Sequence, residues 1–163
     1  MNPTLNTYKT TVDLDVTTRS EMIALLNQQL ADSLDLYSQS KQAHWNVKGM
    51  HFIALHELFD QVAEAVEGTV DTIAERVTAL GADAQGTVRM SATNSTLPEF
   101  PGNLDTSEMF VNAMIERVGA FANSSRRAAT LALEAGDEVT GDVFVEITRE
   151  MDKYLYFLEA HIQ

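Results

Sequence analysis

Hydrophobic residues recur at steps of three and four positions along four long stretches of the chain, which is the period of an amphipathic helix. No stretch shows the strict alternation of apolar and polar residues that is typical of a half-buried β-strand. The predicted helices cover about residues 18–47, 52–80, 105–136 and 137–158. The pattern therefore predicts an all-α protein.

The predicted helices have recognisable boundary signals. Thr18-Arg19-Ser20-Glu21 matches a capping box, so the first helix is expected to start there. A glycine follows each of the first three helices, at Gly49, Gly81 and Gly136, and serves as a stop. Residues 1–17 are rich in Thr and Asn and lack periodicity, so we expect a flexible N-terminal tail followed by one domain over residues 18–163.

The connection between the second and third helices is long. Residues 82–104 hold two glycines and two prolines among small polar residues, with room for one short helix. Connections of this length usually carry function or cross from one end of a bundle to the other. The order of short, long and short connections predicts a ferritin-like four-helix bundle with a crossover between its second and third helices.

Composition and charge narrow the function. The chain has 163 residues, of which 45% are hydrophobic, which is enough for one folded domain. It has no cysteine, which excludes thiol catalysis, cysteine-ligated zinc and disulfides. A formal net charge of −13 disfavours binding to DNA and to anionic membranes and favours binding of cations. With no apolar run near the ~20 residues of a membrane span and no signal-like N-terminus, we expect a cytoplasmic protein with no membrane partner.

Two histidines and a carboxylate are predicted to converge near the first turn. His44 and His56 are equidistant from a chain reversal near residue 50, so an antiparallel hairpin would place them face to face. Asp60 lies four residues after His56, on the same helix face. This donor set suits Fe(II), Mn(II) or Zn(II).

A second pair of carboxylates, Asp71 and Glu75, lies further along the same helix. At ~1.5 Å per residue the two pairs are about 16 Å apart, too far for one ion. If two copies of this helix pack antiparallel about a two-fold axis, His56 faces Glu75 of the partner subunit and Asp60 faces Asp71 of the partner subunit, because both pairs of residue numbers sum to 131. This predicts two shared metal sites per dimer. A lone His/Asp pair at this spacing is usually only a surface contact, which is the alternative.

The residues near the predicted axis are small. Ala63, Ala65 and Gly68 would let the two helices approach closely. Because glycine in mid-helix costs about 1 kcal/mol relative to alanine, we expect a packing reason for Gly68.

Three segments carry a resemblance to a known family. They are Lys41-Gln-Ala-His-Trp-Asn-Val-Lys-Gly49, Phe52-Ile-Ala-Leu-His-Glu57 followed by Asp60, and Asp71-Thr-Ile-Ala-Glu-Arg76. They resemble the Dps family of mini-ferritins, named as DNA-binding proteins from starved cells, and the likeness extends to residues 155–162. The resemblance implies a hollow homododecamer with ferroxidase centres at its dimer interfaces. There Fe(II) would be oxidised, preferentially by hydrogen peroxide, and then stored as ferric mineral, which protects against oxidative stress.

The resemblance also implies which residues bind the metal. One subunit would supply His44, His56 and Asp60, and its two-fold partner would supply Asp71 and Glu75. Iron is the expected metal, with zinc or manganese as substitutes. Ordinary ferritins place a Glu-x-x-His motif within one bundle, and its absence here favours the intersubunit site.

Other acidic residues have two interpretations each. Asp137, Asp142 and Glu146 resemble the acids that line a three-fold pore in this family, or they are acids that favour the helix dipole. Glu64 and Glu67 would nucleate mineral, or they form a solvated face.

The sequence indicates the roles of the tryptophan and the two remaining histidines less clearly. Trp45 would intercept stray oxidising equivalents, or it is a core aromatic residue between the first two helices. His51 and His161 receive no role beyond an exposed loop position and a helix end.

Few basic residues are available to hold DNA. Residues 1–19 contain only Lys9 and Arg19, which Asp13 and Asp15 offset, and no basic extension precedes Gln163. Because each phosphate contact contributes through counterion release, we predict weak or absent DNA binding. The alternative function is a nucleoid-associated, DNA-protecting protein whose metal site is secondary or structural.

Overall fold

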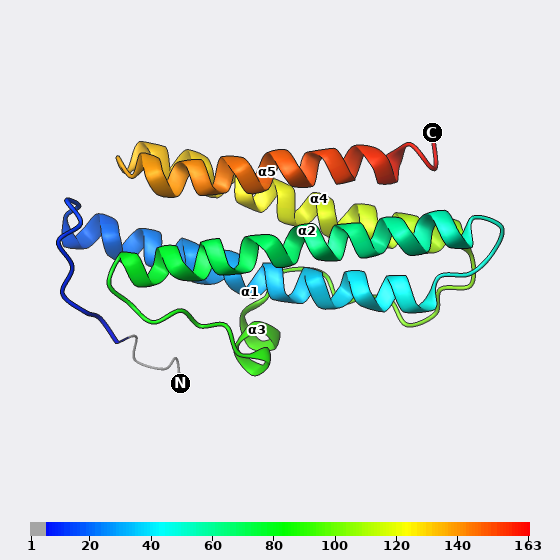
Figure 1. Ribbon diagram of the computed structural model, residues 1–163, viewed down its shortest axis with the longest axis horizontal. Helices are drawn as coiled ribbons and strands as arrows, with labels where there is room; N and C mark the ends of the chain where they lie inside the picture. Colours follow the sequence, from blue (N-terminus) through cyan, green and yellow to red (C-terminus); the bar gives the residue numbers. More distant parts are fainter. Residues whose placement is uncertain (1–5) are drawn as a thin grey trace.

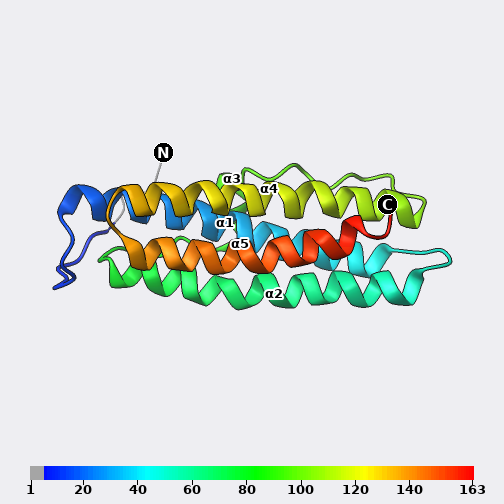
Figure 2. The ribbon, with the colours of Figure 1, turned by 90° about the horizontal axis from the view of Figure 1, so that it is seen from above.

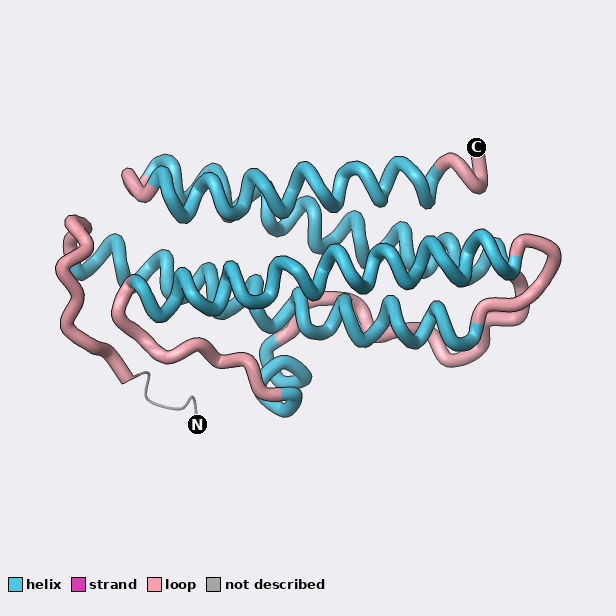
Figure 3. Tube along the Cα trace, viewed as in Figure 1, coloured by secondary structure: helices cyan, strands magenta, loops and turns pink. Residues whose placement is uncertain are grey.

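Five helices make up the ordered framework of this protein, whose computed structural model describes residues 6–163 (Figure 1). The helices are α1 (Val16–Asn46), α2 (Phe52–Ala79), α3 (Val88–Asn94), α4 (Ser107–Glu134) and α5 (Glu138–Glu159). Within the described residues there is no strand, and the only β-type pairing is an isolated bridge between Thr7 and Ala82 (Figure 3). The predicted all-α class is confirmed.

The four long helices form two antiparallel hairpins, α1 with α2 and α4 with α5, which pack side by side (Figure 2). The α1–α2 turn and the α4–α5 turn lie at opposite ends of the bundle. The connection from α2 to α4 carries α3 and runs along the outside of the bundle from one end to the other. This is the predicted ferritin-like bundle with its crossover.

The first helix begins at Val16, before the predicted capping box. The Asp15 carboxylate is the N-cap and accepts hydrogen bonds from the amides of Thr17 (2.8 Å) and Thr18 (3.1 Å) and from the Thr18 hydroxyl (2.7 Å). The prediction that Thr18 caps the helix is wrong, because its hydroxyl donates to Asp15 instead of accepting from the helix.

Residues 6–10 lie against the C-terminal end of α2 and the residues that follow it. The Tyr8 amide donates to the Gly81 carbonyl (2.7 Å), the Thr10 hydroxyl donates to the Ala79 carbonyl (3.2 Å), and the Tyr8 hydroxyl and the Asn6 amide both donate to Asp83. The first helix thus begins inside the predicted tail of residues 1–17, and hydrogen bonds hold part of this segment without any hydrophobic periodicity, whereas the flexibility of the tail stays a prediction. The prediction for residues 1–5 falls outside the described part of the chain.

The core lies where the apolar faces of the four long helices meet. Phe59, Phe121 and Phe144 are among its largest fully buried side chains. Burial of a side chain of this size contributes about 1.5–3 kcal/mol. The crossover is fixed to this core by buried polar groups: Asp32 accepts from the Thr96 amide (2.6 Å), and the Arg117 guanidinium donates to Gln39 (2.8 Å) and to the Glu99 carbonyl.

Across residues 6–163, no helix has both the length and the apolarity that a membrane crossing requires.

Candidate metal centre

The α1–α2 turn brings His44 and His56 into direct contact. Their imidazole rings are stacked, with centroids 3.7 Å apart and planes inclined by 23°. His44 lies in the last turn of α1 and His56 lies one turn after the start of α2, so the short hairpin places them opposite each other. The prediction that the two histidines face each other is confirmed.

Reciprocal hydrogen bonds hold the two rings. The His44 Nδ1–H donates to the His56 carbonyl oxygen (2.7 Å), and the His56 Nδ1–H donates to the His44 carbonyl oxygen (2.8 Å). A carbonyl oxygen can only accept, so both Nδ1 atoms carry the proton in the neutral rings. Each Nε2 atom therefore keeps its lone pair, which is the atom that a metal ion needs.

Asp60 lies one turn after His56 and is partly exposed. Its Oδ1 atom is 4.0 Å from the His44 Nδ1 atom and contacts the Lys41 ammonium group. The hydrogen bond from Lys41 holds the pKa of Asp60 below its ordinary value. The carboxylate is therefore ionised near neutral pH, as a metal ligand must be.

Asp71 and Glu75 are exposed on the later turns of α2, away from the histidine pair. Among residues 6–163, no three or more His, Asp or Glu side chains are gathered closely enough to hold a metal ion. A single chain therefore brings together His44, His56 and Asp60 only in part, and leaves Asp71 and Glu75 apart from them.

The three small residues of α2 differ in exposure. Ala63 is 1% exposed and packs inside the chain's own core, so it cannot face a second helix. Ala65 also packs against this core, whereas Gly68 is exposed, and a Cβ atom built on it would meet no atom within 4 Å. The expectation is therefore wrong for Ala63, which faces inward, whereas half-buried Ala65 and exposed Gly68 line the same groove and their approach to a partner stays a prediction.

Asp137 does not line a pore. It is 2% exposed, is the N-cap of α5, and accepts from the Arg76 guanidinium (2.8 Å), the Thr140 amide (3.0 Å) and the Thr140 hydroxyl. Burial alone would raise the pKa of Asp137, but these hydrogen bonds outweigh it and lower the pKa. The alternative interpretation, an acid that stabilises a helix N-terminus, is the correct one for this residue.

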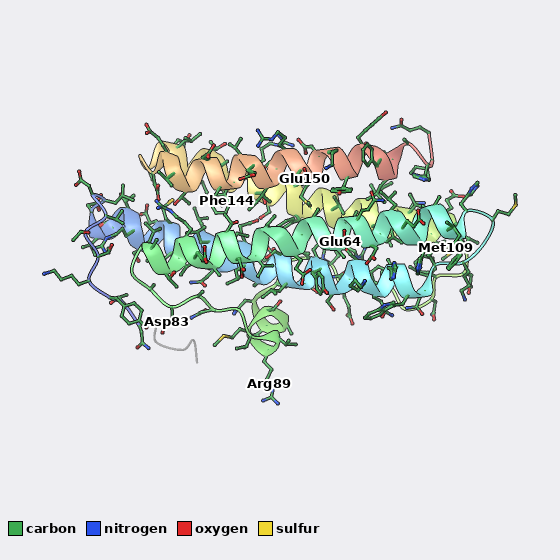
Figure 4. The ribbon with its side chains drawn as sticks, viewed as in Figure 1. Glu64, Asp83, Arg89, Met109, Phe144 and Glu150 are labelled. Atoms are coloured by element: carbon green, nitrogen blue, oxygen red, sulfur yellow. The ribbon has the colours of Figure 1, made fainter. Side chains whose placement is uncertain are left out.

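The remaining acidic candidates are exposed. Asp142 and Glu146 lie on α5, and Glu64 and Glu67 lie on α2. Glu64 and Glu146 line one groove between α2 and α5, which Glu150 also lines. Figure 4 labels Glu64 on α2 and Glu150 on α5. Pore lining by Asp142 and Glu146 and mineral nucleation by Glu64 and Glu67 stay predictions.

Trp45 is 66% exposed, so it does not fill the contact between α1 and α2 as a core residue would. Its predicted role in intercepting oxidising equivalents stays a prediction. His51 and His161 line one cavity at the end of the bundle, where the His161 Nδ1–H donates to the Phe157 carbonyl (2.7 Å).

Two residues near the candidate ligands were not predicted to act there. Lys41 contacts Asp60, and Arg76, the neighbour of Glu75, links α2 to the start of α5. Lys41 lies one helical turn before His44, which is the signal that could have indicated it. The Arg76 contact joins residues 61 positions apart and leaves no comparable signal.

Comparison with known proteins identifies the fold and the family. Residues 23–163 match the Ferritin-like domain. The chain is 42% identical to a DNA protection during starvation protein from Agrobacterium fabrum over 98% of both chains. It superposes on DpsC from Streptomyces coelicolor with a TM-score of 0.91 and 30% identity, covering 97% of this chain and 92% of that one. For Dps from Microbacterium arborescens in the high iron form, the TM-score is 0.85 and the identity 30%, over 94% and 99%.

The bundle topology, the domain match over residues 23–163 and the identity to these relatives agree, and the chain belongs to the Dps family of ferritin-like proteins.

Proposed function

We propose that this protein is a ferroxidase and iron store, which oxidises Fe(II) at sites shared between two subunits. Each site would comprise His44, His56 and Asp60 of one subunit and Asp71 and Glu75 of the partner subunit. The ferric product would be stored as mineral inside a hollow homododecamer. Membership of the Dps family supports iron storage in general terms, and the arrangement of α2 supports this particular site.

The observation that carries the proposal is the histidine pair. Both Nδ1 atoms are hydrogen-bonded to carbonyl groups, so both rings are fixed in the tautomer that leaves Nε2 free for a metal. The ionised Asp60 lies beside them, 4.0 Å from His44. A chance contact between two surface histidines would not need two reciprocal hydrogen bonds between partly buried rings.

The exposure of Asp71 and Glu75 supports a shared site. The two carboxylates have no metal-binding partners within the described part of their own chain, yet they lie on the same helix as His56 and Asp60. Antiparallel packing of two α2 helices would bring each pair to the other chain's histidines. A two-fold axis would repeat the arrangement and give two identical centres per dimer.

The ligand set suits iron oxidation. Carboxylates stabilise Fe(III) relative to Fe(II), and neutral imidazoles retain Fe(II) without adding further negative charge. Two ferrous ions supply two electrons to one hydrogen peroxide molecule, which takes up two protons and yields two waters. Pairing two Fe(II) ions with one peroxide in this way avoids the release of a hydroxyl radical, and it is why we propose peroxide as the preferred oxidant.

Substitution of Glu75 tests the centre. Glu75→Ala removes a ligand that only the partner's site would use, and we expect it to abolish peroxide-driven Fe(II) oxidation, followed by the absorbance of the ferric product. Glu134→Ala, at the exposed end of α4, is the matched control and should keep the wild-type rate. An unchanged rate in Glu75→Ala would refute the assignment.

The name of the Agrobacterium relative, a DNA protection during starvation protein, points to a second candidate function. We propose that this chain protects by consuming iron and peroxide and binds DNA weakly or not at all. Lys9 and Arg19 are the only basic residues among positions 6–19, and the Arg19 guanidinium lies 3.5 Å from the Leu80 carbonyl. A net charge of −13 per subunit adds repulsion.

A gel-retardation assay checks this expectation. At neutral pH and about 0.15 M salt we expect no stable complex with linear duplex DNA. A tight complex that survives this salt concentration would favour the DNA-protecting function instead.

A further inference from the structure

Lys41 lies inside the candidate metal centre without an assigned role. It is on α1, one turn before His44, and its ammonium group contacts the Oδ1 atom of Asp60. The side chains are 22% and 36% exposed, so this ion pair lies at the surface of the hairpin and a solute can reach it. The Lys41 ammonium group thus contacts the same carboxylate that a metal ion would bind.

A metal ion and this ammonium group cannot share the same lone pair. Asp60 Oδ1 accepts a charge-assisted hydrogen bond from Lys41, and a divalent cation that binds this oxygen must displace the donor. Two positive charges at the same carboxylate also repel each other. Lys41 therefore opposes metal binding by both position and charge.

Lys41 also has a place to which it can move. Lysine is a compact charge on a flexible four-carbon stem, and its three donors can rotate. Glu64 is exposed one turn after Asp60 on the same helix, so a second carboxylate lies along α2 next to the one that Lys41 contacts. An ammonium group displaced from Asp60 would therefore remain near negative charge.

We propose that Lys41 is a competing internal cation that sets the metal affinity of the centre. It neutralises and orients Asp60 while no metal is bound, and it leaves Asp60 when a divalent cation binds there. This inference rests on the proposed function of the site. Lys41 is then a positioning residue whose presence lowers the affinity of the centre for metal. A residue that only supported the ligand geometry would instead raise that affinity.

Zinc titration of the assembled, full-length protein tests the proposal, because Zn(II) binds without being oxidised. We expect Lys41→Gln to bind zinc about fivefold more tightly than wild type, the ratio that corresponds to about 1 kcal/mol for a partly exposed ion pair. Lys41→Arg keeps the charge and should bind no more tightly than wild type. Lys48→Gln removes an exposed positive charge that makes no ion pair with Asp60, and should leave the affinity unchanged.

The outcomes separate this inference from the proposed function. Affinity in Lys41→Gln that is equal to or weaker than wild type overturns the role of Lys41, provided that size exclusion and circular dichroism show the same assembly and helix content. Asp60→Asn shows which part of the zinc binding occurs at the centre, because this variant should lose that part. If Asp60→Asn leaves zinc binding unchanged, the shared centre itself is contradicted, whatever Lys41 does.

Discussion

Asp137 shows how one buried carboxylate can join two parts of the bundle. It caps α5 through Thr140 and pairs with Arg76 of α2, so it connects the α4–α5 hairpin to the helix that carries four of the five proposed ligands. Because Asp137 is buried and the Arg76 side chain is only 14% exposed, loss of one partner leaves the other charge largely uncompensated. The residue therefore matters for stability more than for iron passage.

The stability of Asp137→Asn should depend on pH. The substitution keeps the cap but removes the charge, so we expect the free energy of unfolding to fall by about 2 kcal/mol at pH 7, the range for hydrogen bonds to a charged group. The pKa of Asp137 is lowered in the folded state, so its stabilisation is present above the unfolded value of 3.8 and is lost as the pH falls further. The difference between variant and wild type, measured by urea denaturation, should shrink below that pH.

Asp142→Asn is the control for this measurement. Asp142 is exposed on the same helix, and its substitution should change the stability by less than about 0.5 kcal/mol. A wild-type advantage over Asp137→Asn that stays constant from pH 7 to strong acid would contradict the importance of the buried charge.

At the scale of elements, α2 organises the candidate site. Its first turns present His56 and Asp60 to α1, and its later turns carry Asp71 and Glu75 exposed. Its apolar side, which includes Phe59, Val62 and Val66, is fully buried in the bundle. The helix is therefore anchored on one face while its ligand-bearing positions remain accessible.

Gly68, in the middle of this helix, has low helix propensity. A Cβ atom there would meet nothing within 4 Å, so Gly68→Ala gains helix propensity without a clash inside the chain. We expect the free energy of unfolding to rise by about 0.5–1 kcal/mol, measured by urea denaturation.

Gly141→Ala is the matched contrast, because its Cβ atom would lie 2.9 Å from a Leu133 side-chain carbon and should bring no gain. If Gly68→Ala instead weakened the assembly, a second helix would have to approach closely at that position.

The element positions could be predicted closely from the sequence, because helical periodicity and three glycines with positive φ mark them. The start of α1 could not, since Asp15 and Thr18 are both good caps and only the folded backbone decides which one accepts. His44 and His56 could be paired because a short turn makes their positions symmetric. The Lys41–Asp60 and Arg76–Asp137 contacts depend on how neighbouring helices are rotated about their axes, which periodicity does not specify.

In the whole molecule, the proposed metal centre requires two chains. One chain folds into a complete ferritin-like bundle, yet its described residues hold only part of the proposed ligand set in one place. The excess of 24 acidic over 11 basic residues per chain favours the accumulation of cations. Oxidation would then take place at the junction between subunits, and storage in the space that the assembly encloses.

Subunit complementation tests this shared centre most directly. His56→Ala and Glu75→Ala subunits are each expected to be inactive, but a mixed dimer would contain one centre with both native residues. If the two variants are unfolded together in equal amounts and reassembled, random two-fold pairing should restore peroxide-driven Fe(II) oxidation to about a quarter of that of identically treated wild type. A mixture that stays as inactive as either variant alone, although reassembled wild type is active, would contradict the account.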